Sequence, residues 1–316
     1  MKKKILIIGF VLVFSLILSV ILFNQSENIT SKVINTKENL PAKDIKEIYK
    51  DNLTLKIVKR VDMGHEFLID VIEHNNRLYY YDLYIKLAKE RGYKVTSYVD
   101  YIENYKDTNQ KVLILRHDID VINEGTNKMF EIEKRNNVKA TYYFRWETFN
   151  KKLIDDLNTS GFEVGLHYET IATYCDKYNK KNLNKYDLGR CRGELKQEIR
   201  NFKSKSGINI KTIASHGANT NIRIKIPNNI LFEGENYSDY GIISETYDKV
   251  ILKKYITTYI SDGYLYNNFG FKYTNNPIDA IVKDDKVIEF LSHPSHWNFS
   301  PAEIANILKK INSYKI

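Results

Sequence analysis

KVLILRHDID, residues 111–120, decides the fold class of this chain: its first half is apolar and β-branched, and its second half is polar and charged. The same pattern recurs at FEVGLHYE (162–169), TIASHG (212–217) and VIEFLSHP (287–294). A further short apolar run, ATYYF (140–144), lies between them. Short apolar runs separated by longer amphipathic segments are typical of βαβ units, so the sequence predicts an α/β fold with a largely parallel sheet.

The apolar runs and the amphipathic segments give a first set of elements. We expect strands at Lys111–Leu115, Ala140–Phe144, Phe162–Leu166, Thr212–Ala214 and Val287–Leu291. Helical periodicity is clearest at Tyr80–Arg91, Glu124–Asn136, Lys151–Thr159, Arg190–Lys205 and Pro301–Tyr314. The last of these helices begins with a serine cap and a proline in its first turn, which favours a helix start there.

Four of the seven histidines follow directly on predicted strands. They are His117, His167, His216 and His293. The carboxyl ends of parallel strands meet at one edge of a sheet, which is where α/β proteins build their sites. A single histidine at a strand end is more often structural than functional, whereas four that converge on one edge predict a site.

Asp118 and Asp120 are two positions apart, so on an extended chain both carboxylates point to the same side, with His117 and Ile119 on the other. Two like charges this close need a cation between them or a proton on one of them. We expect one aspartate to ligate a metal ion and the other to remain as a base. A solvated turn or a Ca²⁺-type loop is the alternative interpretation of Asp-x-Asp taken alone.

Imidazoles from other strand ends complete the expected chemistry. His167, with His216 as a further candidate, would bind the metal ion through nitrogen beside the aspartate oxygen, and one coordination position would remain for water. A divalent ion in such a site lowers the pKa of bound water from 15.7 to about 7 and polarises an amide or ester carbonyl. His293, on the last predicted strand, is placed to protonate the leaving group.

The motifs LRHDID, KATYYF, FEVGLHYE, IASHG and FLSHPSHW, in this order, resemble the polysaccharide deacetylase family, the NodB-homology domain of carbohydrate esterase family four. The resemblance covers roughly residues 75 to 316. It implies a distorted (β/α)7 barrel that uses a divalent metal to remove acetyl groups from N- or O-acetylated glycans. It also implies Asp118 as the base, Asp120 and His167 as metal ligands and His293 as the general acid.

Two positions depart from the family pattern. The second motif of the family has another metal-binding histidine four residues after the first, where this chain has Ile171. The third motif is usually Arg-x-Pro, where this chain has Ser215-His216-Gly217. His216 supplies the missing nitrogen in one interpretation; in others Glu169 or water fills the gap, or the site binds metal weakly or not at all. We expect Zn²⁺, with Co²⁺, Mn²⁺ or Ni²⁺ as alternatives.

Other polar and aromatic residues near the strand ends are candidates for binding a sugar. Packing against the final helix is the competing interpretation for His296 and Trp297, and a salt bridge inside the barrel is the competing interpretation for Arg116. These candidates are Arg116, Trp146, Tyr168, Glu169, His296 and Trp297.

The N-terminus carries an apolar run of 19 residues without charge, Ile5–Phe23, preceded by three lysines. This length suits a membrane-spanning helix, and the lysines place its start in the cytoplasm. No small-x-small cleavage site follows, so we expect an uncleaved signal anchor at residues 1–23, or a secreted protein if cleavage occurs. Residues 24–44 are polar and predict a tether, and residues 45–316 the catalytic domain.

Composition excludes several classes of protein. With 43% hydrophobic and 28% charged residues, the chain is too polar for a multispanning membrane protein. The net charge of +9 is modest and forms no Arg/Lys stripe, so we expect no nucleic-acid partner. Two cysteines exclude a disulfide framework. Cys175 and Cys191 either pair with each other or stay free.

The sequence therefore predicts metal-dependent deacetylation of a cell-wall or surface polysaccharide, by a domain that a single-pass anchor holds outside the cytoplasm. One alternative is a noncatalytic glycan-binding protein on a deacetylase-like barrel. Another is a metal-dependent hydrolase of a different carbon–nitrogen bond.

Overall fold

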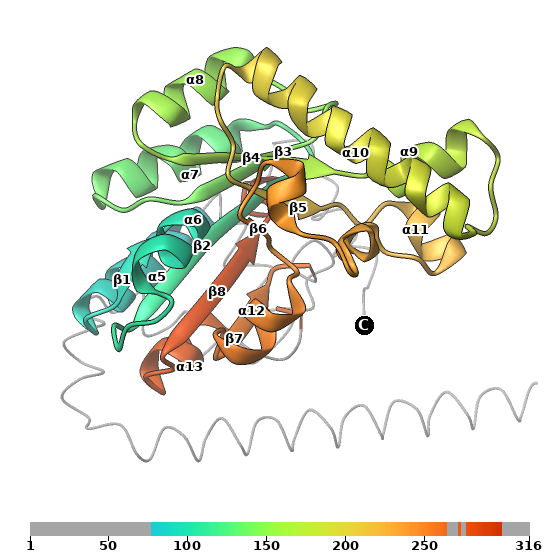
Figure 1. Cartoon of the computed structure of the whole chain (residues 1–316). Coiled ribbons are helices and arrows are strands. Elements are labelled where there is room, and N and C mark those ends of the chain that lie inside the picture. The colour runs from blue at the N-terminus through green and yellow to red at the C-terminus, as the bar shows by residue number, and fades with distance from the viewer. Residues whose placement is uncertain (1–76, 264–270, 273–275, 299–316) are drawn as a thin grey trace, which may run out of the picture. The chain divides into compact units, whose positions relative to one another are not determined.

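The computed structural model describes residues 77–263, 271–272 and 276–298 (Figure 1). The predicted anchor (1–23), tether (24–44) and last helix (301–314) lie outside these residues, so those predictions stay open. Within the described residues, none of the helices combines the length and the apolar composition that a membrane span requires.

One sheet of eight strands organises the described residues, and every ladder between two of its strands is parallel. The order is β6-β5-β4-β3-β2-β8-β7, with β1 beside β2. The strands are β1 (Lys94–Thr96), β2 (Val112–Ile119), β3 (Thr141–Phe144), β4 (Glu163–Tyr168), β5 (Thr212–Ser215), β6 (Ser244–Glu245), β7 (Thr258–Ser261) and β8 (Val287–Ser292).

Strand β2 is the centre of the sheet, and all eight of its residues are buried. β1 pairs with its first half, where Lys94 lies opposite Val112, and β3 pairs with its second half, where Arg116 lies opposite Thr141. β8 runs along its other edge. Burial on both faces explains why this strand has a continuous apolar run rather than an alternating one.

The sheet curls strongly, so that its strands converge from several directions (Figure 1). Among the described residues no ladder joins the outer strands β6 and β7. The predicted α/β class is therefore confirmed, and the predicted (β/α)7 barrel takes the form of a curled, open sheet in this part of the chain.

Helices connect successive strands and cover the sheet (Figure 1). The α-helices are α5 (Leu78–Glu90), α6 (Tyr98–Asp100), α7 (Glu124–Arg135), α8 (Lys151–Thr159), α9 (Thr170–Lys177), α10 (Lys185–Ser206), α11 (Asn219–Ile224), α12 (Lys249–Lys254) and α13 (Pro277–Val282). Shorter helical turns are η1 (Tyr101–Tyr105), η2 (Asn228–Phe232), η3 (Tyr237–Tyr240) and η5 (Pro294–His296).

Local sequence sets the limits of the longest helix, α10. The Asn184 side chain accepts a hydrogen bond from the Asp187 backbone N–H, and the Asp187 carboxylate accepts one from the Asn184 N–H, which is a capping box. The helix ends at Gly207, whose φ of 72° is the left-handed conformation that glycine adopts without steric cost.

Glycine is also required inside strand β4. A Cβ atom at Gly165 would lie 2.4 Å from ring atoms of Tyr143 and 2.7 Å from the carbonyl oxygen of Thr212. The buried Tyr143 ring occupies this space, and its hydroxyl lies 2.6 Å from the Thr212 Oγ1 atom. Tyr143 on β3 therefore contacts Thr212 on β5 across Gly165, which has no side chain to fill the space between them.

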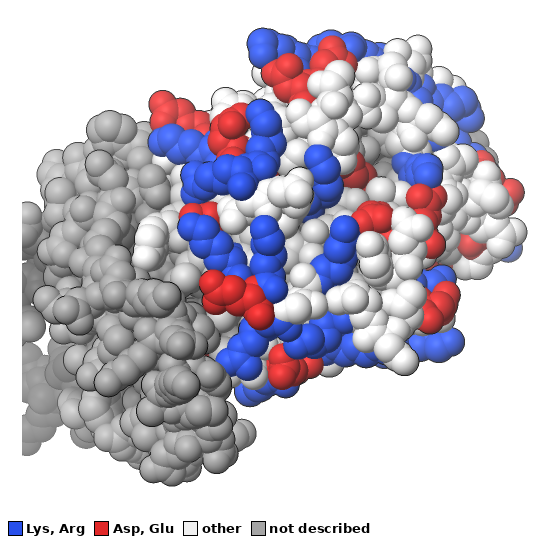
Figure 2. Space-filling view, turned by 90° about the vertical axis from the view of Figure 1, so that its left-hand side faces the viewer, with Lys and Arg blue, Asp and Glu red and all other residues white. Residues whose placement is uncertain are grey.

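The surface carries both charges. On the face of Figure 2, Lys and Arg side chains are mixed with those of Asp and Glu. Lys111–Asp284, at 2.8 Å, and Lys211–Glu103, at 2.6 Å, join opposite charges beside the starts of β2 and β5.

The five predicted strands and the four predicted helices that fall in the described residues are confirmed, with shifted ends. β2 continues to Ile119 and β4 to Tyr168, so His117 and His167 lie within strands and not after them. The short strands β1, β6 and β7 were not predicted. Cys175 and Cys191 are both buried and free, so their pairing was a wrong alternative.

Candidate metal centre

The two aspartates of the Asp-x-Asp motif have different environments. Asp118 is buried within β2, and Arg116 donates to both of its carboxylate oxygens, at 3.0 and 2.8 Å. Burial alone would raise the pKa of Asp118, but the charge of Arg116 and its hydrogen bonds outweigh burial and lower this pKa. Asp120 follows the end of β2 and is partly exposed. Asp118 is therefore a fixed, ionised carboxylate beside a more accessible one.

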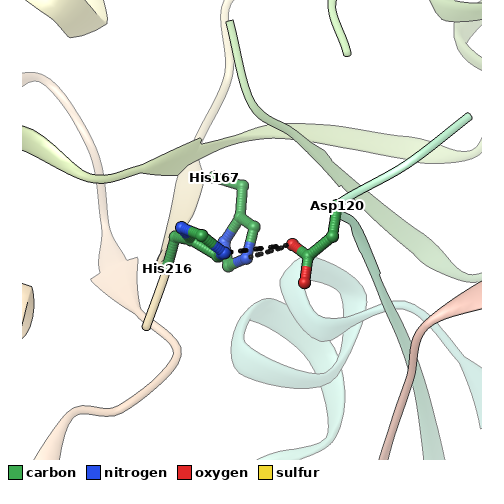
Figure 3. Close-up of side chains that lie close together, drawn as sticks. All are labelled: Asp120, His167 and His216. Carbon is green, nitrogen blue, oxygen red and sulfur yellow. Dashed lines mark ion pairs between the residues drawn. The ribbon is translucent and has the colours of Figure 1, made fainter. Parts of the chain in front are cut away.

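Asp120, His167 and His216 come together at the carboxyl edge of the sheet (Figure 3). The Oδ1 atom of Asp120 lies 3.3 Å from Nε2 of His167 and 3.6 Å from Nε2 of His216. One ligand atom from each residue fits within a span of 4.8 Å. These are the three metal ligands predicted from the sequence, and they come from the ends of β2, β4 and β5.

The second ring nitrogen of each histidine is already bound to an acceptor. Nδ1 of His167 lies 3.1 Å from the Ala214 carbonyl oxygen, and Nδ1 of His216 lies 2.7 Å from Oε2 of Glu169. The hydrogen bond from His216 outweighs burial and lowers the pKa of Glu169 to about 2, so this carboxylate only accepts. Each Nδ1 must therefore carry a hydrogen, and Nε2 is the ring atom that faces Asp120 in both histidines.

The Nε2 atoms of both rings thus face one carboxylate oxygen of Asp120. Oδ1 of Asp120 is buried and has no hydrogen-bond partner among the described residues. Metal-binding histidines commonly donate their other N–H to a carboxylate or a backbone carbonyl, as both do here. The donor set of one oxygen and two nitrogens fits Zn²⁺ or a related divalent ion with an open position.

His293 lies beside this cluster. Its Nε2 atom is 3.7 Å from Oδ2 of Asp120, and its Nδ1 atom is 2.6 Å from Oδ1 of Asp262. Burial would lower the pKa of His293, but the charges of Asp262 and Asp120 and the hydrogen bond to Asp262 raise it to about 9. His293 therefore carries a proton at neutral pH and can donate it.

Asp262 is a further candidate for the site that the sequence analysis missed. Its buried carboxylate accepts hydrogen bonds from the ring and the backbone N–H of His293, and from Nε1 of Trp297 at 2.8 Å. Asp262, His293 and His296 also lie close enough to hold a metal ion. Because three N–H groups already occupy the oxygens of Asp262, we interpret this residue as the group that holds and charges His293.

Arg116 does not line a sugar site, because its side chain is fully buried. Besides Asp118, it contacts Glu289 at 3.4 Å and lies 4.5 Å from the centre of the Tyr247 ring. Burial raises the pKa of Glu289 to about 7 and that of Glu245 to about 8, so the charge of Arg116 is directed mainly to Asp118.

Three aromatic candidates for sugar binding pack within the fold. Tyr168 and Trp297 are buried, at 0% and 1% exposure, so the prediction that they contact a sugar is wrong. Trp146 donates to Glu198 on α10 at 3.0 Å and stacks on Phe149. We therefore assign Trp146 to the packing of α10.

Glu169 and His296 remain near the site. Glu169 is engaged by His216 and by Arg145, whose NH2 group lies 3.0 and 3.1 Å from its two oxygens, so it holds a protein group in place of a sugar. The ring centre of His296 lies 4.8 Å from that of His293, and its side chain is 19% exposed. Sugar binding by His296 stays a prediction. Ile171 is buried in the first turn of α9 and supplies no ligand atom.

A scan against protein-family models finds no match, and no curated protein matches the sequence. Solved structures do match. A CE4 family pseudoenzyme from Bacillus anthracis is 15% identical at a TM-score of 0.34, over 65% of this chain and 62% of that one. The catalytic domain of a peptidoglycan N-acetylglucosamine deacetylase from Eubacterium rectale is 16% identical at 0.36, over 65% and 86%. A polysaccharide deacetylase from Bacillus cereus is 17% identical at 0.34, over 65% and 88%.

In its sequence motifs the chain resembles the polysaccharide deacetylases. Its match spans less than two thirds of the pseudoenzyme's length.

Proposed function

We propose that this protein is a metal-dependent deacetylase that removes N- or O-acetyl groups from a cell-wall or surface polysaccharide outside the cytoplasm. The single observation that carries the proposal is the set formed by Asp120, His167 and His216, whose possible ligand atoms lie within 4.8 Å of one another. An ionised carboxylate and a protonated imidazole adjoin this set, as acyl transfer to water requires.

The groups of the chain divide the reaction between them. A divalent ion held by Asp120, His167 and His216 would polarise the acyl carbonyl and make water more acidic. Asp118 accepts the proton of the attacking water, and Arg116 keeps this carboxylate ionised and oriented. His293 donates its proton to the departing sugar amine or alcohol, and Asp262 holds the ring for this transfer.

The location is part of the proposal. An apolar run at Ile5–Phe23, after three lysines, supports a single-pass anchor with the domain outside the cytoplasm. A polysaccharide of the cell wall or cell surface is the acetylated substrate that such a domain would meet.

Elemental analysis of the full chain tests the metal. The protein is purified in detergent without a chelating tag, beside its Asp120→Ala variant. We expect about one equivalent of a transition metal in the wild type, lost in the variant, and acetate release from acetylated glycans that depends on this metal. A wild type that binds no metal after incubation with Zn²⁺, Co²⁺ or Mn²⁺ contradicts the proposal.

Ile171 favours a second candidate, a noncatalytic glycan-binding protein, because the family's second histidine is absent there. This candidate predicts glycan binding without metal and without acetate release. Hydrolysis measured on a panel of acetylated glycans and simple amides separates the deacetylase and the glycan-binding protein from a hydrolase of another carbon–nitrogen bond.

A further inference from the structure

His216 lies in a loop, directly after the short strand β5. A ligand in a loop needs support, because metal binding demands that the ring hold one orientation to within a fraction of an ångström. Two sets of contacts restrain His216, one on its backbone and one on its ring.

The backbone of His216 is fixed on both sides. Its N–H donates to the Tyr168 carbonyl at 2.8 Å, and its carbonyl accepts from Nδ2 of Asn228 at 2.7 Å. Oδ1 of the buried Asn228 accepts from the backbone N–H of Ile171 at 2.8 Å. Asn228 therefore connects His216 to Ile171, the position where the family motif has its second histidine.

The ring of His216 is restrained by one carboxylate. Glu169, at the start of α9, accepts from Nδ1 of His216 at 2.7 Å. Arg145 holds Glu169 through both carboxylate oxygens, and its NH1 group reaches the backbone oxygen of Asp120 at 3.5 Å. The arginine thus connects the support of one candidate ligand to the backbone of another.

We propose that Glu169 is a positioning residue that makes His216 the third metal ligand: it holds the hydrogen on Nδ1 and the ring in place, so that Nε2 faces Asp120 and His167. This inference depends on the metal site of the proposed function. Without Glu169 the imidazole is free to rotate and to move its hydrogen to Nε2, which removes the lone pair that a cation needs.

Zn²⁺ affinity, measured on the full chain by competition with a chromophoric chelator, tests the inference. Glu169→Ala is expected to weaken Zn²⁺ binding roughly 10–100-fold, the range found when a partner of a metal-bound histidine is lost. Glu169→Gln is expected to restore part of the affinity, because its amide oxygen still accepts from Nδ1. The control is Glu147→Ala: Glu147 also pairs with Arg145, at 2.8 Å, but it is 70% exposed and should leave affinity unchanged.

A double-mutant cycle separates positioning of His216 from any other effect. In a His216→Ala background, Glu169→Ala should weaken Zn²⁺ binding no further. An equal loss in both backgrounds, or unchanged affinity in Glu169→Ala, would overturn the inference while the metal site stood. A wild type that binds no Zn²⁺ would overturn the inference and the proposed function together.

The tautomer gives a readout that does not need metal. Nitrogen-15 spectra of the metal-free wild type should show the hydrogen of His216 on Nδ1, and Glu169→Ala should show a mixture of tautomers. A hydrogen on Nε2 in the wild type would contradict the inference even if Glu169 variants lost affinity.

Discussion

Two histidine–glutamate pairs lie in the described part of the chain, and they differ in what the second ring nitrogen does. His117 on β2 lies 2.6 Å from Glu133 through Nε2, and its Nδ1 lies 2.7 Å from the Ser292 hydroxyl. His216 lies 2.7 Å from Glu169 through Nδ1, and its Nε2 faces Asp120. The first pair uses both nitrogens within the core, whereas the second leaves one nitrogen available at the sheet edge.

The surroundings of the two glutamates deepen the contrast. Glu133 also accepts from the Tyr81 hydroxyl at 2.5 Å and the Tyr142 hydroxyl at 2.6 Å, and neither His117 nor Glu133 is exposed. Glu169 is 23% exposed and is held by Arg145. A histidine with every nitrogen satisfied stabilises the fold; one with an unused lone pair beside a carboxylate can bind an ion.

The largest effect on activity is expected for Asp118→Asn, close to the pair formed by His216 and Glu169. The amide oxygen can accept one of the two hydrogen bonds from Arg116, and the far-UV circular dichroism spectrum of the variant checks that the fold remains. The group no longer accepts a proton. Acetate release should fall roughly 10²–10⁴-fold, the usual contribution of a general base. Metal content should be unchanged. Activity within tenfold of the wild type would remove Asp118 from the mechanism and leave its carboxylate a structural role like that of Glu133.

The comparison itself is tested by matched alanine variants of the two histidines. His117→Ala leaves the buried Glu133 without one of its partners and opens a cavity, so we expect it to lower the free energy of unfolding by about 2–4 kcal/mol. His216→Ala, at the sheet edge, should lower it by less than about 1 kcal/mol. Urea unfolding of the metal-free proteins measures both.

Zn²⁺ affinity should respond in the opposite order, with a loss in His216→Ala and none in folded His117→Ala. Equal destabilisation by the two variants would show that both pairs are structural.

The smallest effect concerns a third histidine–carboxylate pair, His293 and Asp262. His293 acts as an acid while protonated, so activity should be full below its pKa of about 9 and be lost as the pH rises through that value. Asp262→Asn removes the negative charge that raises this pKa. The alkaline limb of the pH–rate profile should then move about one unit or more toward lower pH. If the alkaline limb stays at the same pH in Asp262→Asn, the loss of activity at high pH comes from the titration of a group other than His293.

Much of this arrangement could be predicted from the sequence, because apolar runs followed by polar residues mark the ends of buried parallel strands. That pattern correctly placed Asp120, His167 and His216 at one edge. The alternation of side chains along the strand also put His117 on the side opposite Asp118 and Asp120, and there it lies 2.6 Å from Glu133 on α7. Only tertiary contacts decide which nitrogens are already used.

The misses have different physical causes. Strands β1 and β6 have three and two residues, too few for any periodicity to develop, whereas β7 has four residues, as many as the predicted strands β3 and β5. Asp262 follows β7 and was lost with it, although the polar residue after the run Tyr259–Ile260 repeats the signal seen elsewhere. Tyr168 and Trp297 were misjudged because an aromatic residue near a strand end suits a core as well as a groove.

Gly165 has a consequence for how this sequence can change. The missing side chain on β4 admits the Tyr143 ring, which sets the spacing of β3 and β4 two residues before His167. In a library of all single substitutions, every replacement of Gly165 should reduce the amount of folded protein, although no atom of Gly165 takes part in the proposed reaction. A smaller residue at position 143 would not make room for a side chain here, because a Cβ atom would still lie 2.7 Å from the backbone oxygen of Thr212. Glycine should therefore be retained at position 165 whichever residue occupies position 143.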